Sequence, residues 1–204
     1  LSLGSSVHLA LREWWGLPTS LRTPASAVAV LRRVWLPDGF RDDAQSQSWL
    51  GATCGWVSRY VTTVDASTEP LGLERTVGLR TQRLAFSGRV DRLDLRGTGD
   101  GSRVVVVDYK TGRHPPTDPD ARASLPLALY AAAAQATLRR STRRVELHHL
   151  PSGTVAAWDH DDRSLGRQLE RADAIGAEAQ AAELRAAAGD PTEEVFPPAP
   201  GGLC

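Results

Sequence analysis

Two segments, Ser87–Arg92 (SGRVDR) and Val107–Gly112 (VDYKTG), lie on either side of a break at 97–102 that reads GTGDGS. Residues of these types favour turns, so the two segments are predicted to form the strands of a β-hairpin. If the hairpin is centred on the middle of the break, opposed residues have numbers that add up to 199. Asp91 and Asp108 then face each other across the sheet, with β-carbons roughly 5 Å apart.

Two directly opposed carboxylates repel each other and destabilise a sheet unless a cation lies between them. Mg²⁺ commonly binds one or two carboxylates and keeps several of its waters. A metal-bound water is a better nucleophile near neutral pH, and the ion stabilises charge that grows on a phosphate. Lys110 lies two residues after Asp108, on the same face of the strand, where it can orient the water or donate to a phosphate oxygen. The pattern therefore indicates metal-assisted hydrolysis of phosphodiesters.

Lys110 is the only lysine among 24 basic residues, which indicates either a special role for its ammonium or a coding bias towards arginine that left one lysine by chance. The residues by themselves leave a structural alternative open. Asp91 could cap the end of its strand and pair with Arg89 or Arg92. A register that differs by one residue would place the two acids on opposite faces of the sheet.

Composition narrows the class of protein. A chain of 204 residues with 41% hydrophobic and 24% charged residues is typical of a soluble globular domain. The sequence has no apolar run long enough for a membrane helix, so we expect a cytoplasmic protein without membrane association. Two cysteines do not make a secreted disulfide framework. The net charge of +0 argues against a protein that coats DNA.

The chain contains no Met, and we expect it to be an internal piece of a longer protein. We expect one domain over 1–204, with a helical part at 1–65, an α/β core at 70–190 and an irregular tail at 191–204. The order of elements predicts an α/β fold with a central mixed β-sheet flanked by helices. Helices are expected at about 5–15, 24–36, 43–64, 124–140 and 164–188, with Thr23-Pro24 as the start of the second. Strands are expected at 71–79, 83–95, 103–109, 144–150 and 154–159, and a loop at 114–120.

The motifs GRVDRLD at 88–94 and DYKTG at 108–112 resemble those of the PD-(D/E)XK nuclease superfamily. They are most similar to its RecB-like exonuclease branch, which includes the nuclease domains of RecB and AddB. The segment GSSVH at 4–8 is similar to the helical histidine motif that precedes the sheet in that branch. The resemblance covers nearly the whole chain. It implies a restriction-endonuclease-like core with an N-terminal helical segment, and a deoxyribonuclease that depends on Mg²⁺ or Mn²⁺.

The resemblance also implies roles for single residues. Asp91, Asp108 and Lys110 would be catalytic, with Lys110 as the catalytic lysine. His8, Asp91, Asp108 and the backbone carbonyl of Tyr109 would bind the metal ion.

Two further expectations come with departures from the family pattern. Tyr130 stands where the branch has the tyrosine of a Gln-x-x-x-Tyr motif that positions DNA, but Pro126 replaces the Gln. Cys204 stands where the first trailing cysteine of a [4Fe-4S] cluster is found in many RecB-like nucleases. One thiolate cannot hold a cluster that takes four, so a cluster is expected only in a longer protein.

The implied partners are DNA, as a single strand or a duplex end, and a helicase domain or subunit. Two alternatives to a RecB-like exonuclease stay open. The first is a catalytically inactive nuclease fold that binds DNA or acts as a scaffold in a helicase–nuclease complex. The second is an endonuclease of the resolvase or restriction type.

Overall fold

A computed structural model describes residues 2–81 and 83–196 of the chain. Its centre is a five-stranded sheet with the strand order β1-β2-β3-β4-β5. The strands are β1 (Gly72–Arg80), β2 (Ala85–Arg96), β3 (Arg103–Lys110), β4 (Thr142–His149) and β5 (Thr154–Asp159). All neighbours pair antiparallel except β3 and β4, which are parallel. The expected mixed sheet flanked by helices is therefore confirmed.

The register of the central hairpin is the one that the sequence predicts. Arg92 pairs with Val107 and Leu93 with Val106, so paired residue numbers add up to 199. The valines of β3, Val104–Val107, are 0% exposed. A run of apolar residues buried on both faces is what a central strand requires.

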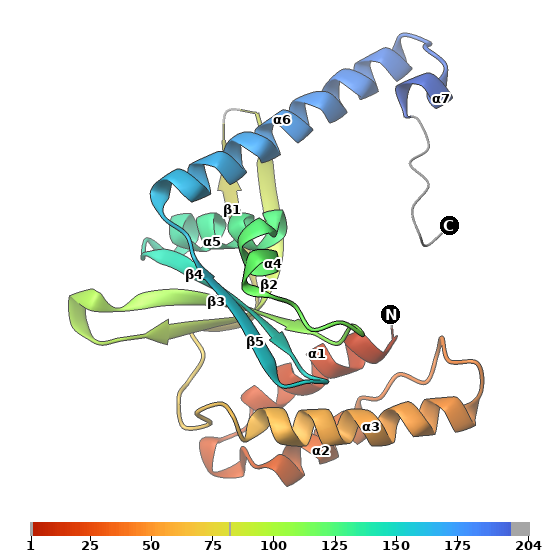
Figure 1. Cartoon of the computed structure of the whole chain (residues 1–204), viewed down its shortest axis with the longest axis vertical. Helices are drawn as coiled ribbons and strands as arrows, with labels where there is room; N and C mark the ends of the chain where they lie inside the picture. The colour runs from red at the N-terminus through yellow and green to blue at the C-terminus, as the bar shows by residue number, and fades with distance from the viewer. Residues whose placement is uncertain (1, 82, 197–204) are drawn as a thin grey trace.

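Three helices cover one face of this sheet: α1 (Ser2–Trp15), α2 (Pro24–Arg33) and α3 (Asp43–Val61). They form the layer at the bottom of Figure 1. The apolar stripe of α1 is buried, and with α2 and α3 it packs against the β3 side chains that face this layer, Val105, Val107 and Tyr109. His8 on α1 thereby reaches the middle of β2 and the end of β3.

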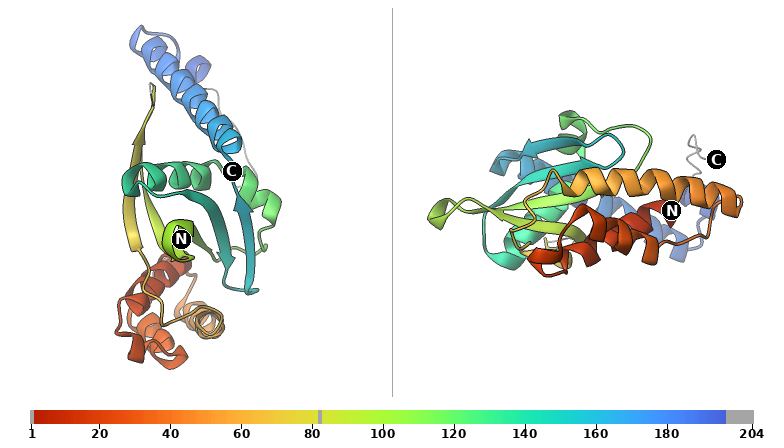
Figure 2. Two further views of the ribbon diagram at one scale, coloured as in Figure 1. Left: turned by 90° about the vertical axis from the view of Figure 1, so that its left-hand side faces the viewer. Right: turned by 90° about the horizontal axis from the view of Figure 1, so that it is seen from below.

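The opposite face is covered by α5 (Leu125–Leu138), the crossover between β3 and β4 (Figure 2). A parallel pair needs such a crossover, because no tight turn can join its strands. α4 (Asp118–Ala123) precedes it, so the prediction of a loop at 114–120 is wrong at its end. Thr117 and Asp120 form a capping box, which starts a short helix there.

The last long helix, α6 (Asp162–Ala187), extends away from the sheet in Figure 1. Its described buried residues are Leu165 and Ala172, both in its first half. The tail was expected to be irregular, but it contains the short helix α7 (Thr192–Val195). None of the described helices is long and apolar enough to cross a membrane.

Candidate active site

His8 joins the helical layer to the sheet. Its Nδ1 lies 3.1 Å from Oδ1 of Asp91 on β2, and its Nε2 lies 3.2 Å from the carbonyl oxygen of Tyr109 on β3. The side chain of His8 is 32% exposed and that of Asp91 11%, so solvent reaches this pair only in part. Three groups that the sequence singles out are thus brought together at the edge of the α1–sheet contact.

Asp91 also interrupts the strand pairing beside it. Its Oδ2 accepts a hydrogen bond of 2.8 Å from the backbone amide of Tyr109. The β2–β3 ladder extends from Arg96 only as far as Arg92, one residue before Asp91. The carboxylate therefore occupies the place where the next ladder bond would form, and its other oxygen is left for His8.

Asp108 lies one position beyond the last residue of β3 that pairs with β2, and continuation of this register places it opposite Asp91. Its Oδ2 is 2.6 Å from Nζ of Lys110, whose side chain is 48% exposed. Burial and the charge of Asp91 raise the pKa of Asp108, and the ammonium of Lys110 opposes this increase. The predicted acid pair and the lysine thus influence one another directly.

Glu74 on β1 is part of the same cluster, and the sequence analysis missed it. In the β1–β2 ladder Leu73 pairs with Arg92 and Arg75 with Val90, which leaves Glu74 opposite Asp91. Its φ of 45° is left-handed, which is uncommon outside glycine and is often found at functional sites. Glu74, Asp91 and Asp108 therefore occupy one row across three neighbouring strands.

The negative charge of this row affects its members. Burial opposes protonation of His8, but the hydrogen bond and charge of Asp91 outweigh it and raise the pKa of His8. Burial, and then the charge of Asp91, raise the pKa of Glu74. The cluster thus favours positive charge in its midst, either as bound protons or as a cation.

The donor atoms fit a hard divalent cation. One ligand atom from each of His8, Glu74 and Asp91 lies within 4.8 Å of the other two. The carbonyl oxygen of Tyr109 is adjacent, as its contact with His8 shows. Carboxylate and carbonyl oxygens suit Mg²⁺ and Mn²⁺. The three-residue group differs from the expected set, because it includes Glu74, whereas Asp108 is engaged by Lys110.

A comparison with known families agrees with this geometry. The sequence model of the PD-(D/E)XK nuclease superfamily matches residues 1–204. The chain belongs to this superfamily. Membership indicates a nuclease that uses a divalent metal ion and acts on nucleic acid. A search of curated proteins finds no significant match.

Tyr130 on α5 of this PD-(D/E)XK core lies beside the acids. A β-carbon added at Gly88 would be 2.4 Å from Cε1 of Tyr130 and 3.0 Å from Cζ of Phe86. Only glycine at this position leaves room for the tyrosine ring against β2. Burial, followed by the charges of Asp108 and Asp91, raises the pKa of Tyr130. The ring of Tyr130 thus packs on β2 three residues before Asp91, within the electrostatic influence of both aspartates.

The side chain of Tyr109 is anchored on the other face of the PD-(D/E)XK sheet. Arg92 donates from Nη1 to the hydroxyls of Tyr109, at 3.1 Å, and Tyr60, at 3.0 Å. Its Nη2 donates to Asp94 at 3.0 Å, and its guanidinium lies 4.8 Å from the ring centroid of Trp15. Tyr109, whose main chain contacts both His8 and Asp91, is thus held in place by the buried Arg92 through its side chain.

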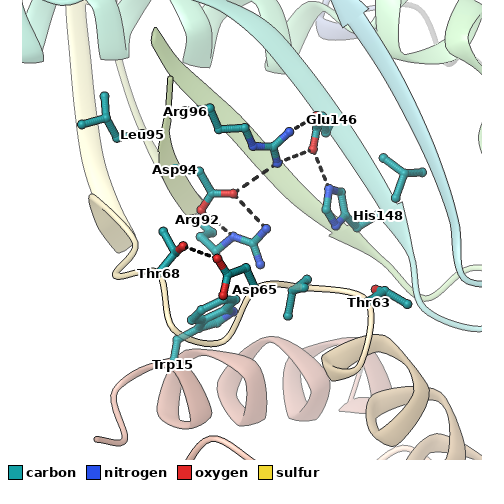
Figure 3. Close-up of a pocket in the computed structure, with 12 residues that line it drawn as sticks. Trp15, Thr63, Asp65, Thr68, Arg92, Asp94, Leu95, Arg96, Glu146 and His148 are labelled. Carbon is teal, nitrogen blue, oxygen red and sulfur yellow. Dashed lines mark hydrogen bonds and ion pairs between the residues drawn. The ribbon is translucent and has the colours of Figure 1, made fainter. Parts of the chain in front are cut away.

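This anchor belongs to a longer polar network around a cavity of about 500 Å³ (Figure 3). The hydroxyl of Tyr60 is 2.9 Å from Nδ1 of His148, and Nε2 of His148 is 2.8 Å from Glu146. Burial would raise the pKa of Glu146, but hydrogen bonds from His148, Arg96 and Arg144 hold it well below its ordinary range. Since Glu146 stays ionised, His148 donates to it from Nε2 and accepts from Tyr60 at Nδ1.

The expected iron–sulfur ligand, Cys204, lies outside the described residues. Cys54 is a buried free thiol on α3. It has no place among the groups around His8.

Proposed function

We propose that this chain is the catalytic domain of a deoxyribonuclease that depends on Mg²⁺ or Mn²⁺, of the RecB-like exonuclease type. Its expected role is in DNA repair or recombination in the cytoplasm. The observation that carries the proposal is the convergence of His8, Glu74 and Asp91 beside the Tyr109 carbonyl. Asp108 and Lys110 lie on either side of Tyr109 in β3.

In this proposal His8, Glu74, Asp91 and the Tyr109 carbonyl hold the ion, with Asp108 beside them. When bound, the metal ion lowers the pKa of a water and stabilises charge on the scissile phosphate. Lys110 lies next to the acids with its ammonium at the surface, where it orients the attacking water or donates to a phosphate oxygen. Tyr130 positions the DNA over the acid row.

The RecB-like assignment is supported by the helical histidine, because His8 comes from a helix that precedes the sheet. An endonuclease of the resolvase or restriction type is the second candidate, since the same chemistry serves both. A scaffold without activity is disfavoured by the complete set of Asp91, Asp108 and Lys110. Inactive copies of a nuclease fold have no need of these groups.

The test is cleavage of end-labelled DNA, single-stranded and duplex, with Mn²⁺ or Mg²⁺. We expect degradation from an end, resistance of circular single strands, and loss of activity in Lys110→Ala. Cleavage of circular DNA would favour the endonuclease. A Lys110→Ala protein that cuts as fast as the unaltered one would refute the assignment.

A longer form of the protein is proposed to carry a [4Fe-4S] cluster with Cys204 as one ligand, and to work with a helicase domain or subunit. Iron and sulfide content of that longer form, with and without Cys204→Ser, tests the cluster. Equal iron content in both would remove Cys204 from the ligand set.

A further inference from the structure

A groove adjoins the acid row along α1. It has a volume of about 440 Å³ and is lined by Gly4, Ser5, His8, Leu9, Arg12 and Glu74. Because His8 and Glu74 belong both to the groove and to the candidate metal site, the groove opens directly onto the reacting position. A chain-like substrate that places one of its units at the acid row therefore contacts the groove through a neighbouring unit.

Arg12 supplies the permanent positive charge of this groove. It lies one helical turn after His8, and side chains four residues apart on a helix share a face with β-carbons about 5–6 Å apart. Arg12 also lines the same groove as Glu74, which projects from β1. Its guanidinium therefore adjoins the acid row.

Arg12 is also available to bind something else. The buried or half-buried arginines below the sheet, Arg92, Arg96 and Arg144, are all engaged by carboxylates. Arg12 is exposed and forms no ion pair within residues 2–81 and 83–196. A guanidinium without a carboxylate partner can donate to a phosphate in the bidentate geometry that suits it.

The charge distribution of the chain makes a local positive group beside the acid row necessary for a polyanion to bind. The net charge is +0, so no general positive field attracts a polyanion. The acid row repels phosphates that are not in contact with a cation. Local positive charge beside the acids is what lets the next phosphate approach.

We propose that the groove along α1 holds the DNA strand next to the scissile phosphate, and that Arg12 binds a backbone phosphate there. The proposal rests on the proposed nuclease function. It assigns the groove a substrate, a polynucleotide strand, and assigns Arg12 the role of a positioning residue that touches the substrate outside the reacting atoms.

The variant that tests it is Arg12→Gln, compared with Arg32→Gln as a matched control. Both arginines are exposed and lie in the last turn of a helix, so either change removes the same favourable interaction with the helix dipole. Arg32 is on α2, which packs against α1 and α3 and does not line the groove.

Binding of fluorescent single-stranded oligonucleotides is measured by anisotropy at several salt concentrations, with Ca²⁺, in a Lys110→Ala background that leaves the DNA intact. We expect Arg12→Gln to raise Kd several-fold and to lower the slope of log Kd against log salt by about 1. The loss should be equal for different base sequences, because a phosphate contact carries no sequence information. Arg32→Gln should match the reference.

Kinetics give the second readout. With Lys110 present, we expect Arg12→Gln to raise KM for DNA with little change in kcat, and Arg12→Lys to restore part of the loss. Unchanged Kd, salt slope and KM in Arg12→Gln would overturn the inference while cleavage by the unaltered protein upholds the nuclease. Weaker binding without any cleavage would refute the nuclease and keep the groove as a DNA site.

Discussion

Three carboxylates in one row, on Glu74, Asp91 and Asp108, are the residues on which the interpretation of this protein depends. The sequence predicts that two of them, Asp91 and Asp108, face each other. The glycine-rich break at 97–102 locates the turn of the hairpin and so fixes the register of its strands. Glu74 was missed because residues 81–84 read TQRL, without the Gly, Asn or Asp that identify a tight turn. The same arithmetic would have placed it opposite Asp91 had that turn been visible.

Glu74→Gln tests whether the third acid binds the ion. We expect the Kd for Mn²⁺, measured by calorimetry, to increase about tenfold, which corresponds to about 1.4 kcal/mol. The fold should be retained, since the change also removes repulsion from Asp91. Glu183→Gln, on the exposed side of α6, serves as the control. Mn²⁺ binding as tight as that of the unaltered protein would remove Glu74 from the ligand set.

Gly88→Ala tests the close packing of Tyr130 on β2. The added methyl group overlaps the tyrosine ring, so we expect the free energy of unfolding to fall by about 1–3 kcal/mol, with slower cleavage. Urea unfolding measures the first effect. In a Tyr130→Ala background the same substitution should cost less, because the shortest contact is gone and only the one with Phe86 remains. An equal cost in both backgrounds would show that the ring does not lie where the structure has it.

At the scale of elements, β3 connects the candidate site to the helical layer through Tyr109. Its main chain meets His8 and Asp91, while its side chain is fixed by Arg92 in the layer below. The sequence predicted the strand from its four valines but not this linkage. A hydrogen bond between a β2 arginine and an α3 tyrosine depends on how the helical layer packs on the sheet, which no local pattern contains.

Tyr60→Phe tests this anchor. The lost hydroxyl accepts a hydrogen bond from Arg92 and donates one to His148, and both of these partners are buried. We therefore expect the free energy of unfolding to fall by about 1–3 kcal/mol. Urea denaturation of the variant measures it. If stability is unchanged, the buried groups find other partners and the network does not hold Tyr109.

His148 gives the network a dependence on pH. Burial, together with the charge of Arg92, lowers the pKa of His148 below its ordinary value of about 6.5 in spite of Glu146. As the pH falls through about 6.5, the unfolded chain takes up a proton that the folded chain excludes, so the free energy of unfolding should decrease. His148→Gln should make this decrease smaller, as followed by urea unfolding between about pH 8 and pH 5.5.

Two other histidines modify the size of that effect. Burial lowers the pKa of His160, which adds a decrease of the same sign, whereas the raised pKa of His8 acts in the opposite direction. A His148→Gln profile parallel to that of the unaltered protein would show that His148 is not the titrating group. The comparison is made without metal, so that binding at His8 does not enter.

The predicted helices and strands agree with those of the structure to within about three residues at their ends, whereas the expectations of irregular chain at 114–120 and 191–204 are wrong in part. Residues 114–120 contain Pro and Asp, which suggest a loop, but Thr117 and Asp120 are also a helix-start signal. At 192–195 a short helix forms in a segment whose prolines favour irregular chain. At 114–120 the sequence thus contains the start of a helix but too little apolar periodicity to reveal it.

At the scale of the whole molecule, the candidate metal site joins the helical layer to the sheet. We therefore expect Mn²⁺ to stabilise the fold, by about 2.7 kcal/mol when its concentration is 100 times Kd. Calorimetry should show a rise in Tm with Mn²⁺ for the unaltered protein and a much smaller one for Asp91→Asn. An equal rise in both would place the stabilising ion somewhere else.

The parallel pairing of β3 with β4 has a consequence for biosynthesis. The groups at the site lie between His8 and Lys110, yet β3 acquires its second neighbour only after the crossover helix and β4 (Thr142–His149) have followed it along the chain. A ribosome-bound chain that has released Lys110 but not β4 lacks the support that buries Val104–Val107. The sheet that positions the candidate site is therefore complete only after β4 has left the ribosome.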